Sequence, residues 1–358
     1  MIISDYFFVV LGALGVLGTV LPLAPSGKPI FRVWDFPRSQ IAAVLALAAA
    51  AALIRFEIDR PLAAVYVATL LSSLAWQAAQ IMPYTPLYKR QARPERSGRD
   101  GPHVRLLASN VLMENRDSAR LLSLIEEVRP DVVLLVETDD WWDAKLEPLT
   151  AQFPYAVRHP QPNCYGMHLF SRLELVDPEI RFLVDEGVPS ITTRLKLKSG
   201  DMVHLYGVHP QPPPFVDTEE RDAELLIVAK EIAAQKRVAI VAGDLNDVAW
   251  SFSTRRFQKV SGLVDPRVGR GLYNTFDARR PWFARWPLDH VFFSPSFRLG
   301  EMCVMRDIGS DHFPFFVALR YAPEEPEGEP PDAESADHEA AEETIEVGLE
   351  KASRSPGP

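Results

Sequence analysis

Hydrophobic residues are concentrated at the N-terminal end of the chain, where three apolar segments precede a more polar remainder. Residues 6–23 and 62–82 are uncharged stretches of 18 and 21 residues. As helices, both can cross the roughly 30 Å hydrocarbon core of a bilayer. Residues 41–54 are apolar for only 14 positions, so this segment either spans with help from Phe36 and Phe56 or lies as a re-entrant or interfacial helix. The pattern predicts a membrane region over residues 1–83 with two to three transmembrane helices.

Charged residues next to the apolar segments predict how the chain is oriented. Lys28, Arg32 and Arg38 precede the second segment. A basic linker, residues 84–102, contains Lys89, Arg90, Arg93, Arg96 and Arg99. If three segments span, both basic stretches lie on one side, and the positive-inside rule places the rest of the chain in the cytoplasm. The start of the chain, Met1 to Asp5, lacks a basic residue, so a cleaved signal peptide is disfavoured.

From residue 103 onward the hydrophobic pattern is that of an α/β domain, which we expect to extend over residues 103–321. Short runs rich in β-branched residues predict strands at residues 104–109, 131–136, 167–171, 191–197, 203–208, 238–243, 288–293 and 315–319. Apolar residues at helical spacing predict helices at residues 118–128 and 218–235. The alternation of strands with helices indicates the α/β class.

The formal net charge of −10 arises at the C-terminal end of the chain. Residues 322–358 carry twelve acidic and two basic residues, so the residues before them sum to zero. This acidic, proline-rich segment is predicted to be a disordered tail. The neutral remainder lacks the basic bias that is typical of nucleic-acid binding. Cys164 and Cys303 have no metal-type spacing, and two separate buried thiols are favoured over one disulfide.

Polar residues recur where the predicted strands end, namely Asn110, Glu137, His209, Asp244, Asn246, Asp289, Asp311 and His312. Any one of them could be a turn cap, but strand ends in α/β sheets converge on a shared cleft. Phosphoryl transfer to water explains the set, because carboxylate and amide oxygens bind a hard cation while imidazole and amide groups stabilise phosphate charge. The sequence contains no Walker loop, no His-Glu-x-x-His zinc helix and no Gly-x-Ser-x-Gly elbow.

The order of these motifs resembles the endonuclease/exonuclease/phosphatase superfamily, which includes deoxyribonuclease I. The resemblance extends from about residue 103 to 320, and its most specific parts are Gly-Asp244-Leu-Asn246 and Ser-Asp311-His312. It also includes Asn274-Thr-Phe and the strand that ends at Ser171-Arg172. The resemblance implies a four-layer α/β sandwich, in which two packed mixed β-sheets are flanked by helices.

The same resemblance implies a role for each candidate residue. Glu137, with Asn110 nearby, would bind Mg²⁺ or Mn²⁺, and Asp311 would lie next to the metal. The catalytic residues would be Asp244, which orients or deprotonates the attacking water, Asn246, which holds a phosphate oxygen, His312, which bonds the scissile phosphate, Asp289, which orients the imidazole, and His209, which lies against the phosphate. Phe276 stands where a tryptophan often follows threonine, and Asn110 sits in Ser-Asn-Val-Leu rather than the frequent Thr-Trp-Asn. Neither departure removes a chemical group, so an active enzyme is expected. His290, which follows Asp289 where an aromatic residue is common, is expected to pack rather than to react.

Three functions compete. The first is a phosphohydrolase acting on a membrane-associated substrate such as a lipid-linked pyrophosphate, a phospholipid head group or a phosphoinositide-like ester, because a tether raises encounter with lipids. Relatives of the lipid-pyrophosphatase kind would place the domain outside the cytoplasm.

The second function is a membrane-tethered nuclease with a basic stripe of Arg255, Arg256, Arg267, Arg270, Arg279, Arg280 and Arg285. The third, an inactive binding module, is disfavoured by the complete polar set. The lipid bilayer and a phosphorylated substrate are the expected partners, and no protein partner can be inferred.

Overall fold

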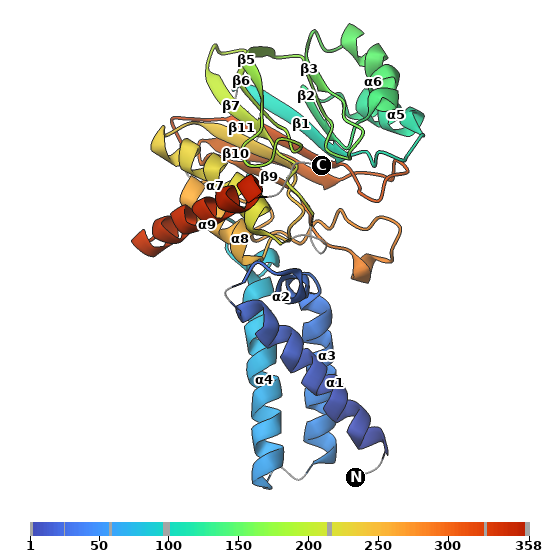
Figure 1. The fold of residues 1–358 in the computed structure, drawn as a ribbon, viewed down its shortest axis with the longest axis vertical. Helices are drawn as coiled ribbons and strands as arrows, with labels where there is room; N and C mark the ends of the chain where they lie inside the picture. The colour runs from blue at the N-terminus through green and yellow to red at the C-terminus, as the bar shows by residue number, and fades with distance from the viewer. Residues whose placement is uncertain are drawn as a thin grey trace.

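Three long helices at the N-terminal end lie together as a bundle beside the α/β domain (Figure 1). The computed structural model describes residues 3–24, 26–56, 59–95, 101–212, 217–325 and 328–354, so Arg96 and Arg99 of the basic linker lie outside it. The helices are α1 (Ile3–Val20), α3 (Arg38–Arg55) and α4 (Pro61–Ile81). All three are long and apolar enough to cross a membrane. The segment that seemed marginal from its apolar run alone is thus part of an 18-residue helix.

The bundle is held together by close apolar packing along its length and by polar contacts near its domain end. Leu45 of α3 and Leu70 of α4 are fully buried, and a Cβ at Gly15 of α1 would approach Leu45 to 2.8 Å. Gln77 of α4 donates to the Thr19 hydroxyl at 3.0 Å and accepts from the Arg38 guanidinium at 3.2 Å. Such small residues and interhelical hydrogen bonds are typical of helices that associate in lipid.

The chain between α1 and α3 connects the bundle to the α/β domain. It contains α2 (Pro29–Arg32) and a short 3-10 helix, Val33–Asp35. The Trp250 indole donates to the Asp35 carbonyl at 2.6 Å, and the Tyr84 hydroxyl, just after α4, donates to the Ala249 carbonyl. Tyr84 and Trp250 belong to one hydrophobic cluster, against which Phe36 packs. The bundle and the domain therefore share a small core.

The α/β domain consists of two packed sheets. The six-stranded sheet has the order β10 (Phe297–Val304), β11 (Phe315–Tyr321), β1 (His103–Asn110), β2 (Val132–Val136), β4 (Met167–Ser171) and β3 (Tyr155–His159). The five-stranded sheet has the order β5 (Glu174–Arg181), β6 (Ser190–Lys196), β7 (Met202–Gly207), β8 (Ala239–Asp244) and β9 (Asp289–Phe293). Both sheets are mixed, since β1 pairs with β2 and β7 with β8 in parallel while the other pairs are antiparallel.

Helices cover the outer face of each sheet. The first sheet carries α5 (Ser118–Val128) and α6 (Asp140–Leu146), and the second carries α7 (Glu219–Ala234) and α8 (Phe252–Ser261). Along β2, Leu134 faces the core between the sheets while Leu135 faces the helices. A strand buried on both faces needs an unbroken hydrophobic run, which residues 132–136 provide. The expected four-layer α/β sandwich is confirmed.

The acidic C-terminal segment differs from the prediction of disorder. Ser335–Arg354 form α9, which packs along α7. Ala341, Ile345 and Gly348 recur at helical spacing; Ala341 is fully buried in the cluster beneath α7, and Ile345 packs against that cluster. At Gly348 a Cβ would approach the Ala223 Cβ to 2.4 Å, so only glycine allows this spacing. The composition of the tail concealed this apolar face, because its many acids lie on the other sides of the helix.

Candidate active site

The carboxyl ends of parallel strands from both sheets meet at one end of the sandwich. Asn110 ends β1, Glu137 follows β2, and Asp244 ends β8. The Asn110 amide nitrogen donates to Glu137 Oε1 at 2.7 Å and to Asp244 Oδ2 at 3.1 Å. One buried amide therefore holds a carboxylate from each sheet. This proximity follows from the topology, because parallel strands present their carboxyl ends at the same edge.

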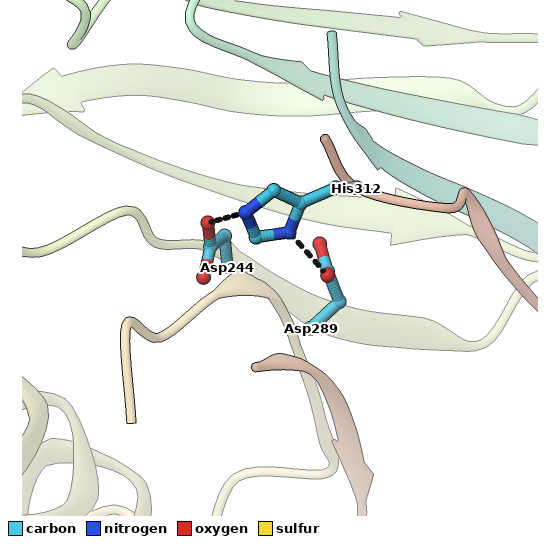
Figure 2. A group of neighbouring side chains, drawn as sticks. All are labelled: Asp244, Asp289 and His312. Carbon is cyan, nitrogen blue, oxygen red and sulfur yellow. Dashed lines mark hydrogen bonds and ion pairs between the residues drawn. The ribbon is translucent and has the colours of Figure 1, made fainter. Parts of the chain in front are cut away.

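His312 lies between two aspartates that face each other across β8 and β9 (Figure 2). Asp244 and Asp289 are register partners in this antiparallel pair. Like charges in such positions repel, and His312 compensates for them. Its Nδ1 is 2.8 Å from Asp289 Oδ2, and its Nε2 is 3.4 Å from Asp244 Oδ2. Burial alone would lower the pKa of His312, but both carboxylates outweigh it and raise the pKa to about 10, so this imidazole is a cation at neutral pH.

His209 is the second histidine of the site and has the opposite charge state. It follows β7, is buried, and its Nε2 lies 3.9 Å from Asp244 Oδ2. Burial lowers the pKa of His209 to about 4, so it is neutral. Its Nδ1 has no hydrogen-bond partner within the described part of the chain. A buried ring nitrogen without a partner is costly, which suggests that a ligand supplies one.

Two residues of the site adopt left-handed backbone conformations. Glu137 has φ 63° and Asn246 has φ 52°. The Asn246 backbone N–H donates to Asp244 Oδ1 at 2.9 Å, and its side chain donates to the Pro210 carbonyl at 2.9 Å. Non-glycine residues with positive φ cluster at functional sites, where the surrounding structure holds them in place. Here the strained turns aim both side chains into the same cavity.

The backbone at position 243 explains why the motif that contains Asp244 begins with glycine. Its φ is 143°, and a Cβ there would approach the Val208 carbonyl oxygen to 1.9 Å. The close approach of β8 to the end of β7 is what brings Asp244 beside His209. Any other residue at position 243 would separate the two strand ends.

Glu137 is the best ligand for a cation among these residues. Burial raises the pKa of Glu137 to about 7, and the charge of Asp244 acts in the same direction. A divalent cation would compensate for both carboxylates, and oxygen donors suit Mg²⁺ or Mn²⁺. Asn110 presents its amide nitrogen to Glu137, since its Oδ1 accepts the Leu112 N–H at 2.9 Å. Asn110 thus positions the carboxylates in this structure, and its role as a metal ligand stays a prediction.

A second grouping of donors also has the spacing of a metal site. Ligand atoms of Asp244, Asp289 and His312 all lie within 4.8 Å of one another. Both ring nitrogens of His312, however, already face the two carboxylates, at 2.8 Å from Asp289 and 3.4 Å from Asp244. Asp244 belongs to both the Glu137 grouping and the His312 grouping. We favour a cation between Glu137 and Asp244, with His312 hydrogen-bonded to Asp289. Asp311 lines the cavity with its carboxylate 3.2 Å from the Arg279 guanidinium, and its metal role stays a prediction.

These side chains open into a cavity of about 220 Å³. It is lined by Phe36, Glu137, Cys164, Tyr165, His209, Pro212, Asn246, Phe276, Leu288, Asp311 and His312. Of the predicted site residues, five line this cavity, while Asn110, Asp244 and Asp289 act on four of those five through hydrogen bonds or charge. The aromatic and apolar part of the lining was not predicted.

The missed residues differ in how they could have been found. Tyr165 directly precedes Gly166, which begins the strand motif that ends at Ser171-Arg172. The sequence therefore contained a recognisable motif next to Tyr165. Phe36 lies in the membrane region, and nothing local relates it to a catalytic cavity. Cys164 and Cys303 are both free thiols and neither is fully buried, so the disulfide alternative is not realised. His290 lies outside the cavity, buried and 2.9 Å from the Asp247 carbonyl, as its packing role requires.

The sandwich fold, with carboxylates and an imidazole gathered at one end, is that of a family of phosphoesterases and nucleases. The model of the Endonuclease/Exonuclease/phosphatase family matches residues 107–312, and the chain belongs to this family. Members of this family hydrolyse phosphoester bonds. No curated protein matches the sequence.

Solved structures agree in fold. Danio rerio TDP2 in complex with a single-strand DNA product is 18% identical, with a TM-score of 0.52 over 61% of this chain and 99% of that one. The catalytic domain of human Nocturnin with bound sulfate is 20% identical, with a TM-score of 0.51 over 64% and 100%. A Bacteroides vulgatus member of the family is 17% identical, with a TM-score of 0.52 over 61% and 99%. At these identities the likeness shows the fold alone.

Replacing Asp289 by asparagine tests the paired imidazole. Loss of this charge lowers the pKa of His312 and frees its ring, so kcat for a soluble phosphodiester should fall by about 100-fold or more, with KM little changed. Asp143 offers a matched control, because it bonds the buried His168 at 2.7 Å outside the cavity. If Asp143→Asn lowers kcat as much as Asp289→Asn, the effect is one of stability rather than catalysis.

Replacing Glu137 by glutamine tests the cation site. The uncharged amide should weaken Mn²⁺ binding by at least about tenfold, measured by calorimetry on the full chain. Glu224 is the control: burial raises its pKa to about 8, so Glu224→Gln should leave Mn²⁺ affinity unchanged. Undiminished Mn²⁺ binding by Glu137→Gln would place the cation elsewhere.

Proposed function

We propose that the protein is a membrane-anchored phosphohydrolase that uses Mg²⁺ or Mn²⁺ to cleave a phosphate ester, diester or pyrophosphate of an amphiphilic substrate. One observation carries the proposal: Phe36, between two candidate membrane helices, lines the same cavity as Glu137 and His312. The anchor thus supplies part of the active-site wall, whereas a simple tether would need no contact with the site.

A row of aromatic rings leads from the anchor to the catalytic histidine. The centroids of Phe36 and Trp286 are 6.3 Å apart, as are those of Trp286 and Phe276. Phe276 lies 4.8 Å from the His312 ring. Aromatic surface along one side of a phosphate site suits a substrate with an apolar portion next to its phosphate.

An exposed aromatic pair lies where the membrane surface would be. Trp282 and Phe283 are 77% and 58% exposed. The Gln40 side chain, in the first turn of α3, donates to the Phe283 carbonyl at 2.6 Å. Because α3 is a candidate span, the pair lies beside the end of a membrane helix, the depth at which tryptophan is favoured. A lipid-linked substrate could therefore reach the cavity without leaving the bilayer surface.

We propose a part in hydrolysis for each group of the site. Asp244, fixed by Asn110 and the Asn246 N–H, would orient the attacking water. The His312 imidazolium would stabilise charge on the phosphoryl oxygens, and neutral His209 would offer a further hydrogen bond. A cation bound at Glu137 would supply Lewis-acid stabilisation of the same charge.

The placement of three arginines disfavours the nuclease alternative. Arg267 is fully buried against Asp265, while the exposed Arg279 and Arg280 pair with Asp277. The buried Arg267 interrupts the predicted basic stripe, and Asp277 offsets part of the remaining charge that a phosphate backbone would need. We also propose the cytoplasmic orientation that the positive-inside rule favours, since the loop before α3 and the start of the linker both lie at the domain end of the bundle.

Replacing Phe36 by alanine tests the contribution of the anchor. Burying a phenylalanine contributes about 1.5–3 kcal/mol, and 1.4 kcal/mol is tenfold in rate. We therefore expect kcat/KM for a long-chain lipid phosphate to fall about tenfold, while hydrolysis of a soluble phosphodiester is nearly unchanged. The assay uses full-length protein in detergent with Mg²⁺.

Two further variants serve as the inactive control and the neutral control for Phe36→Ala. Asp244→Ala should abolish turnover of both substrates, and Phe182→Ala, an exposed aromatic outside the cavity, should affect neither. Equal losses on both substrates in Phe36→Ala would contradict a role in recognising the apolar portion. Full activity of Asp244→Ala would refute the hydrolytic mechanism itself.

A further inference from the structure

A second cavity, of about 840 Å³, lies at the junction of the bundle and the α/β domain. Its walls come from the segment after α1, from α2 and from the domain ends of α3 and α4 on one side, and from α7, α8 and α9 on the other. Figure 1 shows α7, α8 and α9 at the lower left of the sandwich, with α8 just above the helical bundle. None of the residues in its walls belongs to the catalytic set, so its purpose is separate from the chemistry.

Two arginines of α8 line this cavity without a direct ion pair to any acid among the described residues. Arg255 bonds only the Ser251 carbonyl, at 3.3 Å, and Arg256 bonds the Ala340 carbonyl and the Thr344 hydroxyl. Within the described ranges, neither guanidinium forms an ion pair with a carboxylate. Burial lowers the pKa of each guanidinium, and it outweighs the opposite effect of the more distant acids, Asp35 on Arg255 and Asp337 on Arg256.

Most acids in the wall already have cationic partners. Asp35 pairs with Arg38, Asp222 with Arg221, and Glu219 with Lys351. The remaining acid of the wall, Glu343, is exposed to solvent. The positive charge of α8 is therefore available to an anion that enters the cavity.

Buried polar atoms without partners point to the same conclusion. Arg38 and Gln80, both in the wall, are only 4% and 8% exposed. Arg38 Nε and Gln80 Oε1 have no hydrogen-bond partner among the described residues, and the same holds for Arg256 Nε. Buried groups of this kind are normally satisfied, so their number in one cavity indicates a missing ligand. That ligand must accept hydrogen bonds from arginine and donate one to an amide oxygen.

The position of the cavity identifies the source of the anion. Trp76, 43% exposed, lines it from the last turns of α4, and Leu23, 54% exposed, lines it from the end of the first span. If the helices span, this level is the headgroup region of the leaflet that faces the domain. Apolar residues toward the bundle and arginines toward the domain match a lipid whose chains remain in the bilayer.

We propose that the junction cavity binds the headgroup of an anionic phospholipid, with the phosphate against Arg255 and Arg256. The bound lipid would hold α8 and α9 against the end of the bundle. This inference rests on the membrane placement proposed above, but it does not depend on the reaction that the active site performs.

Thermal unfolding of the full chain in nanodiscs tests the site. Phosphatidylcholine nanodiscs are compared with ones in which a minor fraction is phosphatidylglycerol. We expect the anionic lipid to raise Tm by about 2–4 °C for the wild type. The double variant Arg255→Gln, Arg256→Gln should lose this shift, whereas Arg255→Lys, Arg256→Lys should keep most of it because the charge remains.

A matched control and a third arm separate the remaining outcomes. Arg172, which packs on the Phe153 ring away from the junction and forms no ion pair within the described ranges, is the control, and Arg172→Gln should retain the full shift. Inorganic phosphate added to phosphatidylcholine nanodiscs should not reproduce the shift, and if it does, the ligand is a free anion rather than a lipid. An equal shift in the wild type and the double glutamine variant would overturn the proposal. Because unfolding is measured without turnover, failure here is distinct from failure of the proposed phosphohydrolase activity.

Discussion

The active end of the sandwich depends on one buried imidazolium. Asp244 and Asp289 face each other on adjacent strands, and without His312 between them their repulsion would oppose the pairing of β8 and β9. The same Asp244 accepts the amide of Asn110 from the other sheet, so the charge balance at this point also joins the two sheets. The groups that would polarise a phosphate are therefore the groups that hold the strand ends together, and catalysis and packing share the same contacts.

The anchor is built into this arrangement. Asp35, before α3, and Tyr84, after α4, form hydrogen bonds with the segment that follows Asn246. Phe36, next to Asp35 in the chain, lines the catalytic cavity. A flexible tether would raise only the local concentration of substrate. Direct contact also fixes which way the cavity faces relative to the three helices. This contact is the reason for proposing a substrate that enters from the membrane surface and a part for the helical bundle in substrate selection.

Much of the fold was predictable because buried strands and amphipathic helices carry local patterns. The helix Ser118–Val128 has the predicted bounds, and the continuous run of β2 was recognised for the same reason. The strands that escaped prediction, β3, β5 and β10, lie at sheet edges, where one side has no partner strand and polar residues interrupt the pattern. Phe36 and α9 escaped for another reason: their burial depends on contacts with distant parts of the chain, which composition and local spacing do not encode.

The most direct test of an anchored lipid phosphohydrolase is the dependence of kcat/KM on the apolar length of the substrate. Full-length protein in detergent with Mg²⁺ is assayed on lipid phosphates of increasing chain length, and on single-stranded DNA under the same conditions. The account predicts that kcat/KM rises with chain length and that DNA is a poor substrate. A value that is independent of chain length, or faster cleavage of DNA, would contradict it.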